Sequence, residues 1–501
     1  MKGNTQKINI WLRLGAGVVL SLASAGLLTL AFPPYGLWPL IWLSFVPMLI
    51  AQHRVLPRKT SSLAPAIAIG VWLGSYLTPM FGGSGTYMAW LPLLIGGITL
   101  LASSGERAFH ERTGYRWFVA QGALTWVGFE MLRSFLPMMG TWAFVANTLH
   151  SQPWLIQPVS IFSIFGLGLL IMLVNYGLGL GALYLFDRRW QLDPSISVIG
   201  SSAARNWLLG ISAALALWVG LSLALYRAPA APTVRVAALH YDAGKPGGAP
   251  NKFRELTYQA AQDGARIIVW PEVAIEGDPQ VTGTAEFQRL AAETNAYLTL
   301  GYIVRVTEQA FRNEATVLSP DGQFLGVFGK DHPVVFGGET SLTRGTYPVY
   351  DTPLGRIGTM ICYDADFTDT ARKITRNGAQ LILLPSRDWP GIATTHYTHA
   401  VFRAIENRVS VVRSDGSGND SVVIDPYGNI LALALTPGGD REGQVLVADA
   451  PLGTGDSLVV QLGDWMGWIS LAGMAFFVVY DPITKMRAKR SAAPSLQPNQ
   501  V

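Results

Sequence analysis

RIGTMICYDADF, residues 356–367, contains the one cysteine of the chain, Cys362, at a predicted structural boundary. The apolar residues before it are typical of a buried strand, and a helix can begin at Asp364 and the residues that follow. The carboxyl end of a strand is where α/β folds place reacting groups. The stretch therefore predicts an α/β domain with Cys362 at its functional edge.

Two further apolar segments end in residues of complementary chemistry. Glu272 follows one of them in Trp270-Pro271-Glu272, and Lys330 follows the other in Phe328-Gly329-Lys330-Asp331-His332. A carboxylate, an amine and a thiol at neighbouring strand ends are the groups that acyl transfer needs. We therefore take Glu272, Lys330 and Cys362 as candidate catalytic residues.

Most of the remaining chain is apolar. Hydrophobic residues make up 50% of the 501 residues and charged residues 14%, and the mean hydropathy is +0.29. This composition is too apolar for an ordinary soluble protein of this length. Apolar runs of about 17 to 25 residues can cross a bilayer, and the ends of such runs are loose. We predict about eight spans, seven before a polar block and one after it: residues 12–32, 37–51, 64–81, 87–102, 117–135, 158–186, 207–226 and 461–480.

Basic residues alternate between the connecting loops. Several Lys or Arg residues precede the first span and follow the second, fourth, sixth and eighth, whereas the loops at 33–36 and 82–86 contain none. The positive-inside rule then places both termini in the cytoplasm and the polar block on the extracytoplasmic, periplasmic side of the cell membrane. The net charge of +4 is explained by this topology and indicates no nucleic-acid partner. Ala23-Ser24-Ala25 resembles a signal-peptide cleavage site, but the apolar run continues to Phe32, so we expect a retained span.

The polar block is predicted to be one domain, residues 228–456. Residues 1–227 before it contain seven spans, and residues 457–501 contain the last span and a basic cytoplasmic tail. Many strands among few helices predict two packed sheets with helices outside, an α-β-β-α sandwich. The predicted strands are 234–239, 266–270, 297–304, 314–318, 324–328, 356–362, 381–385, 409–413, 421–424 and 444–448, and the predicted helices are 252–263, 284–294, 368–377 and 395–408.

Glu272, Lys330 and Cys362 occur in the order and context of the Glu, Lys and Cys of the nitrilase superfamily. With the predicted spans around them, the whole chain resembles the apolipoprotein N-acyltransferase family. Supporting segments are AFPPYGLWPL at 31–40, FEMLR at 129–133 and RAIENR at 403–408. The resemblance implies transfer of a fatty acyl chain from a phospholipid, through a cysteine thioester, to the N-terminal amine of diacylglyceryl-cysteine in an apolipoprotein. It implies no cofactor and no metal.

The chemistry gives each candidate residue a role. A thiol at its ordinary pKa is only a few per cent ionised near neutrality, so Cys362 needs a base, and Glu272 fits that role. Lys330 and the backbone N–H of Tyr363 fit the stabilisation of an oxyanion, where one donor contributes about 3 kcal/mol. By the resemblance, Asp364, Glu339 and Asn313 are supporting or substrate-binding residues.

The sequence departs from the family pattern in four places. The glutamate of a loop that reads Pro-Phe-Gly-Glu in the family is displaced by one residue in Val335-Phe336-Gly337-Gly338-Glu339, and Asp364 stands where the family tends to have Glu. The loop Pro385-Ser386-Arg387-Asp388-Trp389-Pro390-Gly391 replaces an Asn-Asp segment, and His240-Tyr241-Asp242 replaces Gln-Gly-Asn. These changes leave open a membrane-tethered amidase that hydrolyses small amides with the same triad. The intact triad argues against a third interpretation, a non-catalytic scaffold or transporter.

Other polar residues have simpler explanations. His332 is two residues from Lys330 and is expected to pack within its loop. His396 and His399 are spaced for one helix face, without a third ligand at metal spacing, so we interpret both as structural. Glu130 and Arg133 lie near the outer end of the fifth span, where charge is costly. Pairing with each other at i and i+3 and a role at a substrate portal are equally compatible with the sequence.

Overall fold

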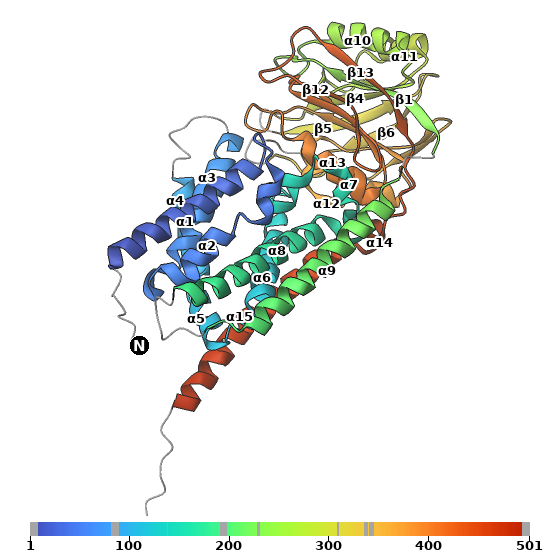
Figure 1. Ribbon diagram of the computed structural model, residues 1–501. Helices are drawn as coiled ribbons and strands as arrows, with labels where there is room; N and C mark the ends of the chain where they lie inside the picture. The colour runs from blue at the N-terminus through green and yellow to red at the C-terminus, as the bar shows by residue number, and fades with distance from the viewer. Residues whose placement is uncertain are drawn as a thin grey trace, which may run out of the picture.

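The structure, a computed structural model, describes residues 9–81, 90–137, 139–190, 198–227, 231–307, 310–334, 339 and 345–492. Figure 1 shows a helical bundle built from the first half of the chain and α15, with an α/β sandwich at one end of it. Lys2, Lys7 and the loop at 82–86, which entered the topology prediction, lie outside the described residues, as do residues 335–338 of the displaced glutamate loop.

The bundle contains five helices that are long and apolar enough to cross a membrane: Ile10–Ala31, Arg58–Leu77, Val159–Arg189, Ser201–Leu225 and Trp465–Arg487. They coincide with five of the predicted spans, and the other three spans stay predictions. Shorter helices lie in two of these three, α4 and α6. The helices of the bundle are α1 (Ile10–Ala31), α3 (Leu63–Leu77), α4 (Leu91–Ala102), α5 (Glu106–Arg112), α6 (Phe118–Ser134), α7 (Pro153–Ile156), α8 (Val159–Arg189), α9 (Ser201–Leu225), α14 (Leu458–Leu462) and α15 (Trp465–Ala492), with the short turns η3 (Arg58–Thr60), η4 (Pro79–Phe81) and η5 (Val145–Leu149).

The predicted span at 37–51 is a broken helix. A proline lies in the first turn of each of its first two pieces, where the missing N–H is tolerated. Asn175 of α8 fills the break: its Oδ1 accepts the N–H of Phe45 at 3.0 Å, and its Nδ2 donates to the carbonyl of Ile41 at 2.8 Å. Irregular backbone inside a membrane protein is stable only when such partners satisfy it. The pieces are η1 (Trp38–Trp42), α2 (Val46–Ile50) and η2 (Ala51–Val55).

The sandwich contains two mixed sheets. The strand order is β13-β1-β2-β4-β5-β6 in the first, with β3 beside β4, and β12-β11-β10-β9-β8-β7 in the second. The central strands of each sheet are parallel, β1 to β2 to β4 and β8 to β9 to β10. The short strand β3 also pairs parallel with β4, and the remaining outer strands pair antiparallel. The strands are β1 (Thr233–His240), β2 (Ile267–Val269), β3 (Ile275–Glu276), β4 (Tyr297–Arg305), β5 (Phe311–Leu318), β6 (Phe324–Gly329), β7 (Val349–Thr352), β8 (Gly355–Thr359), β9 (Leu381–Ser386), β10 (Ser410–Asp415), β11 (Asp420–Ile424), β12 (Ile430–Leu435) and β13 (Gln444–Pro451).

Every predicted strand is present, whereas β3, β7 and β12 were not predicted. The strands lie inside the predicted domain 228–456, although the domain limits themselves stay a prediction. Helices cover the outer face of each sheet (Figure 1): α10 (Pro250–Gln262) and α11 (Thr284–Thr294) on the first, α12 (Thr368–Arg376) and α13 (Tyr397–Asn407) on the second. An aliphatic core that includes Val236, Leu383 and Val412 fills the space between the sheets. The predicted α-β-β-α architecture is therefore confirmed.

The second helical layer joins the sandwich to the bundle. Glu406 of α13 accepts the N–H of Ile164 in α8 at 2.8 Å. Nη1 of Arg408, directly after α13, donates to Oε1 of Gln157 at 2.6 Å. The sheet that carries Cys362 therefore lies on the side of the sandwich next to the bundle.

Candidate active site

Three strand ends meet at one buried place. Glu272 follows β2, Lys330 follows β6, and Cys362 follows β8 and begins the short helix η7 (Cys362–Asp366). Nζ of Lys330 donates to Oε1 of Glu272 at 2.9 Å, and the charges of both side chains act on the thiol of Cys362. Oε2 of Glu272 makes no hydrogen bond to any described residue, which leaves this oxygen able to take a proton. The structure thus brings the three predicted residues together.

Glu339 reaches the same place despite its displacement in the sequence. Its Oε2 accepts Nζ of Lys330 at 2.9 Å and the N–H of Val334 at 2.8 Å. Asn313 on β5 donates through Nδ2 to Oε1 of Glu272 at 2.7 Å and also to Glu339. Two of the supporting candidates, Glu339 and Asn313, therefore join Glu272 and Lys330 in one buried network.

The ammonium of Lys330 is held between two carboxylates. Burial alone would lower its pKa, but Glu272 and Glu339 outweigh burial and hold the pKa of Lys330 well above its usual value. Burial would raise the pKa of Glu339, and Lys330 instead holds that pKa below its usual range. A lysine that stays charged and fixed in position can stabilise negative charge but cannot serve as a base.

Cys362 has an unusual backbone conformation and a protonated side chain. Its φ is +45°, in the left-handed region that residues other than glycine rarely adopt. Such strain is found at functional sites, where the surrounding structure enforces it. Burial, followed by the charge of Glu272, raises the pKa of the Cys362 thiol well above its ordinary value, although Lys330 opposes this. The resting group is therefore a thiol, and a nucleophilic attack requires a base to remove its proton.

Asp364 and Tyr363 follow the cysteine in η7. The carboxylate of Asp364 accepts the N–H groups of Ile361 at 2.9 Å, Asp331 at 3.1 Å and His332 at 2.7 Å. Asp364 therefore ties the loop after Lys330 to the turn that carries Cys362. The ring of Tyr363 packs edge-on against Phe367, with centroids 5.4 Å apart, so the turn is also fixed by side-chain packing.

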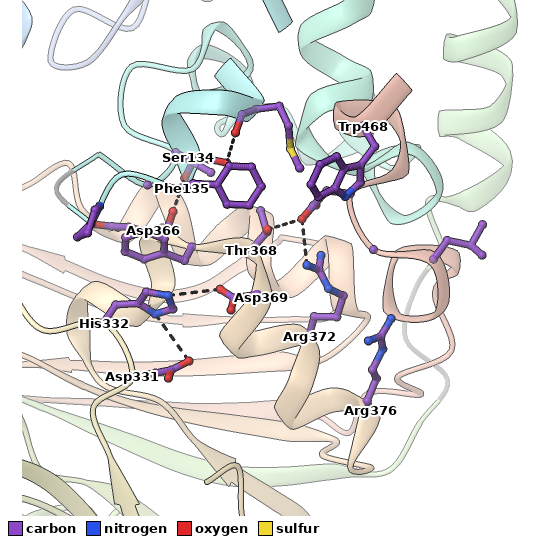
Figure 2. Close-up of a pocket in the computed structure, with 18 of the residues that line it drawn as sticks. Ser134, Phe135, Asp331, His332, Asp366, Thr368, Asp369, Arg372, Arg376 and Trp468 are labelled. Atoms are coloured by element: carbon purple, nitrogen blue, oxygen red, sulfur yellow. Dashed lines mark hydrogen bonds and ion pairs between the residues drawn. The ribbon is translucent and has the colours of Figure 1, made fainter. Parts of the chain in front are cut away.

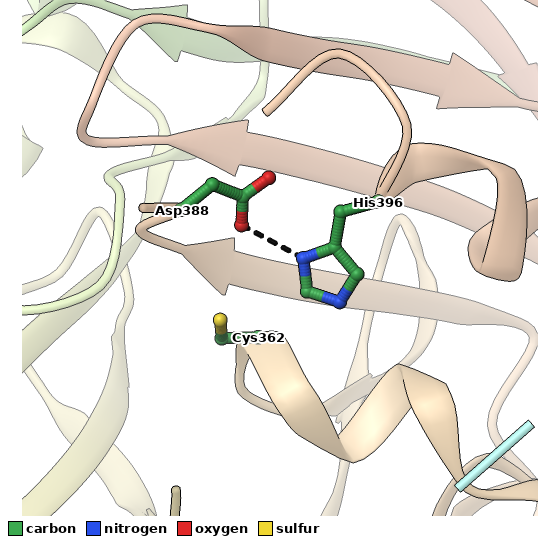
Figure 3. Close-up of side chains that lie close together, drawn as sticks. All are labelled: Cys362, Asp388 and His396. Carbon is green, nitrogen blue, oxygen red and sulfur yellow. Dashed lines mark hydrogen bonds and ion pairs between the residues drawn. The ribbon is translucent and has the colours of Figure 1, made fainter. Parts of the chain in front are cut away.

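A buried ion cluster lies beside Cys362 (Figure 3). Nδ1 of His396 lies 2.7 Å from Oδ1 of Asp388, and Nε2 lies 2.9 Å from Oδ1 of Asp366. Because both ring nitrogens face carboxylate oxygens, the imidazole carries both protons and a positive charge. Burial alone would lower the pKa of His396, but the two carboxylates raise it to about 10. Polar atoms of Cys362, Asp388 and His396 lie within 4.8 Å of one another.

This cluster changes the interpretation of His396 as a purely structural residue. Nη2 of Arg413 donates to Oδ2 of Asp388 at 2.7 Å, so His396 and Arg413 neutralise the carboxylate beside the thiol from two sides. Without them, Asp388 would repel a forming thiolate more strongly. To bind a metal together with Cys362, His396 would first have to leave one of its carboxylates. The sequence signal that was missed is an aspartate shortly after each of two neighbouring strands, Asp366 after β8 and Asp388 after β9.

Glu130 and Arg133 bind a loop that supports this cluster. Oε1 of Glu130 accepts the N–H of Val145 at 3.1 Å, and Nη1 of Arg133 donates to the carbonyl of Trp142 at 2.6 Å. Nε1 of Trp142 in turn donates to Oδ2 of Asp366 at 2.6 Å. The hydrogen bonds of the two charged residues therefore connect the bundle to η7, which differs from the mutual i, i+3 pair considered from the sequence.

Comparison with known proteins agrees with both parts of this architecture. The model of the apolipoprotein N-acyltransferase N-terminal domain matches residues 24–177, and the carbon-nitrogen hydrolase model matches residues 220–458. An apolipoprotein N-acyltransferase of Geobacter metallireducens is 27% identical over 91% of this chain and 94% of its own length. One of Pseudomonas syringae pv. tomato is 25% identical over 83% of this chain and 87% of its own length. The chain belongs to the apolipoprotein N-acyltransferase family.

Amidase relatives match a smaller part of the molecule. An omega-amidase of Homo sapiens is 27% identical over 36% of this chain and 75% of its own length. A share of this size corresponds to a carbon-nitrogen hydrolase domain, whereas the apolipoprotein N-acyltransferases also match the membrane part. The amidase likeness therefore reflects the shared nitrilase superfamily and favours the acyltransferase over the tethered amidase.

Proposed function

We propose that the protein transfers a fatty acyl chain from a phospholipid to the N-terminal amine of diacylglyceryl-cysteine in apolipoproteins, through a thioester on Cys362. The observation that carries this function is the match of both membrane part and hydrolase domain to apolipoprotein N-acyltransferases. A buried Glu272–Lys330–Glu339 network beside the only cysteine supports the assignment of the chemistry to this site.

In the first half-reaction, Oε2 of Glu272 takes the proton from the Cys362 thiol while Sγ attacks the ester carbonyl of the phospholipid. Lys330 and the backbone N–H of Tyr363 stabilise the negative charge on the carbonyl oxygen. The carbon–oxygen bond of the ester then breaks. The leaving oxygen takes the proton from Glu272, so a lysophospholipid departs and the acyl chain remains on Sγ as a thioester.

In the second half-reaction, the α-amine of the acceptor attacks the thioester carbonyl and Glu272 takes a proton from the nitrogen. The carbon–sulfur bond breaks, and the proton passes from Glu272 to Sγ, which regenerates the thiol. Exclusion of water protects the thioester between the two steps, since an exposed thioester would hydrolyse. The position of the Cys362 sheet next to the bundle supports access from the membrane.

The membrane arrangement is part of the proposal. About eight spans cross the cell membrane, seven within residues 1–227 and one within residues 457–501. Both termini then lie in the cytoplasm, and residues 228–456 lie on the extracytoplasmic side. The alternation of basic loops supports this orientation. The two substrates are themselves anchored in lipid, which explains why a hydrolase-like domain is attached to membrane helices at both ends.

The test is intact-mass analysis of the purified full chain after incubation with phospholipid alone. A ping-pong mechanism predicts one acyl adduct and release of lysophospholipid without any acceptor, and Cys362→Ala should form no adduct. A diacylglyceryl-cysteine peptide with a free α-amine should discharge the adduct, whereas an N-blocked peptide should leave it in place. Release of ammonia from small amides without a lipid adduct would instead support the amidase.

A further inference from the structure

A cavity of about 660 Å³ lies where the membrane helices meet the sandwich (Figure 2). Its walls come from the ends of α6 and α15 on the membrane side and from η7 and α12 on the domain side. Glu272, Lys330 and Cys362 are not among its lining residues. Its volume is in the range of sites that bind small molecules.

The cavity wall contains a hydrogen-bond donor and an acceptor of opposite charge that lack partners. Nη2 of Arg372 donates to Oδ2 of Asp464 at 2.9 Å, and Thr368 donates to the same oxygen at 2.6 Å. Nη1 of Arg372 and Oδ1 of Asp464 are buried, yet neither has a hydrogen-bond partner among the described residues. The Asp464 side chain is only 8% exposed. A buried charged atom left unsatisfied is costly, which points to a ligand that supplies the missing bonds.

A second guanidinium adds positive charge on the same face of α12. Arg376 is one helical turn from Arg372, so both side chains point in similar directions and both line the cavity. Arg376 donates to the carbonyls of Val460 and Gln461, the latter at 2.8 Å. Within the described ranges it has no carboxylate at ion-pair distance. Its charge is therefore available to an anionic group in the cavity.

The membrane side of the cavity is apolar and open. Phe135 at the end of α6 is 57% exposed, Trp468 in α15 54%, and Leu462 of α14 58%. The rings of Phe135 and Trp468 lie side by side with centroids 5.6 Å apart, and Figure 2 shows Arg372 and Arg376 below them in the view. Tryptophan is enriched where membrane helices reach the headgroup level. Acyl chains can follow this surface while a polar headgroup enters the cavity.

We propose that this cavity binds the headgroup of a phospholipid that carries both a phosphate and an amine. The phosphate is bound by Nη1 of Arg372 and by Arg376, and the ammonium is bound by Oδ1 of Asp464. Asp331, the residue after Lys330, and Asp366, four residues after Cys362, both line the same cavity. The bound headgroup is therefore separated from the catalytic site by these two segments. Two sources fit this chemistry: the acyl donor of the proposed function, or a lipid that is bound and not consumed.

Binding can be measured without turnover in the full chain with Cys362→Ala. Native mass spectrometry from detergent micelles would compare phosphatidylethanolamine with phosphatidylglycerol, which lacks the amine. Arg372→Gln and Arg376→Gln should each weaken binding of both lipids about tenfold, the effect of losing one charge-assisted hydrogen bond. Asp464→Asn should weaken the binding of phosphatidylethanolamine by a similar factor and leave the binding of phosphatidylglycerol unchanged.

Arg305→Gln is the matched control, because Arg305 is an exposed arginine of β4 that pairs with Glu276 away from the cavity. Arg376→Gln should leave the fold unchanged, because the Arg376 side chain is exposed and the Arg372–Asp464 pair is retained. A loss of binding in this variant therefore does not result from unfolding. Equal affinities for Arg376→Gln and the control, or equal responses of both lipids to Asp464→Asn, would overturn the proposal.

A second measurement identifies the source of the lipid and depends on the proposed function. With Cys362 present, the phospholipid concentration for half-maximal acyl-enzyme formation should rise in Arg376→Gln if the bound lipid is the donor. An unchanged concentration together with weakened binding assigns the site to a lipid that is not consumed. Absence of any acyl-enzyme in the unsubstituted protein would count against the proposed function and leave the binding result standing.

Discussion

Lys330 contacts two glutamates to which the chemistry assigns different tasks. The charge of Glu272 acts on the thiol of Cys362, and one carboxylate oxygen of Glu272 is able to take a proton. Both carboxylate oxygens of Glu339, in contrast, accept hydrogen bonds. We therefore propose that Glu339 fixes the position of the lysine and that Glu272 transfers protons. The network explains how a glutamate displaced by one residue in the sequence can still occupy the site.

We predict that Glu272→Gln reduces the rate of acyl-enzyme formation by about 10²- to 10⁴-fold, the usual contribution of a general base. Glu339→Gln should lose about 10- to 100-fold, because it removes one charged hydrogen bond to Lys330 and no proton acceptor. Single-turnover formation of the acyl adduct on Cys362 measures both rates. A larger loss in Glu339→Gln than in Glu272→Gln would reverse the assignment.

The buried His396 should make stability depend on alkaline pH. Its pKa is raised to about 10 in the folded protein, against about 6.5 in an unfolded chain. A raised pKa stabilises the fold fully below about pH 6.5, and this contribution is lost as pH rises through about 10. The difference in melting temperature between the unsubstituted protein and His396→Gln should therefore be largest near pH 6 and shrink toward pH 10.

His399→Gln is the control for this measurement. Burial lowers the pKa of His399 to about 3, so its proton is already absent above neutral pH in both the folded and unfolded states. Its difference in melting temperature should therefore stay constant between pH 7 and 10. A constant difference for His396→Gln over the same range would show that this imidazole is neutral in the fold.

At the residue scale, the sequence predicted the site residues that follow strands. It missed the site contacts between residues that are far apart in the sequence. Glu272, Lys330 and Cys362 follow apolar strands directly, so a local pattern identifies them. The partners of His396 are a residue 30 positions earlier, Asp366, and Asp388 in a loop of atypical composition. Only the packing of β8 beside β9 brings these two aspartates to the same imidazole.

At the scale of elements, prediction succeeded for the buried central strands and failed for both edge strands of the second sheet. The central strands β9 and β10 are buried along their whole length, and β9 begins with the continuous apolar run LILL. The missed strands β7 and β12 are the two edges of the second sheet. β12 is mostly exposed although its sequence, ILALAL, is apolar, so it lacks the alternation that identifies a half-buried strand.

The broken helix at 37–51 depends on one side chain of another element. We predict that Asn175→Leu lowers the free energy of unfolding by about 1–3 kcal/mol, because the N–H of Phe45 and the carbonyl of Ile41 lose their buried partner. Thermal unfolding in detergent micelles would measure the change. Asn251→Leu, at an exposed position of α10, should alter stability by less than about 0.5 kcal/mol. Equal melting temperatures for the two variants would mean that Asn175 does not stabilise the break.

At the scale of the whole molecule, the basic loops gather at one end of the bundle. Arg54, after the second predicted span, forms an ion pair with Asp187 near the end of the sixth at 2.5 Å. Nη1 of Arg107, after the fourth, donates to the carbonyl of Leu56 at 2.7 Å, and Arg112 pairs with Asp481 of α15. Figure 1 shows the sandwich at the opposite end from α5. By the positive-inside rule, this separation agrees with the proposed extracytoplasmic placement of the sandwich.

The orientation can be tested in a background without other thiols, because the chain contains a single cysteine and Cys362→Ala removes it. Lys245→Cys places a thiol at an exposed position of the sandwich, and Ser104→Cys places one at an exposed position between α4 and α5. Both positions avoid the neighbouring glycines Gly247 and Gly105, whose positive φ values would strain a substitution. A membrane-impermeant maleimide added to spheroplasts should label Lys245→Cys and leave Ser104→Cys unlabelled until the membrane is lysed, since the proposed orientation places the sandwich outside and the loop between α4 and α5 in the cytoplasm. The reverse labelling pattern would place the sandwich in the cytoplasm and the basic loops outside. It would contradict the orientation that the positive-inside rule predicts.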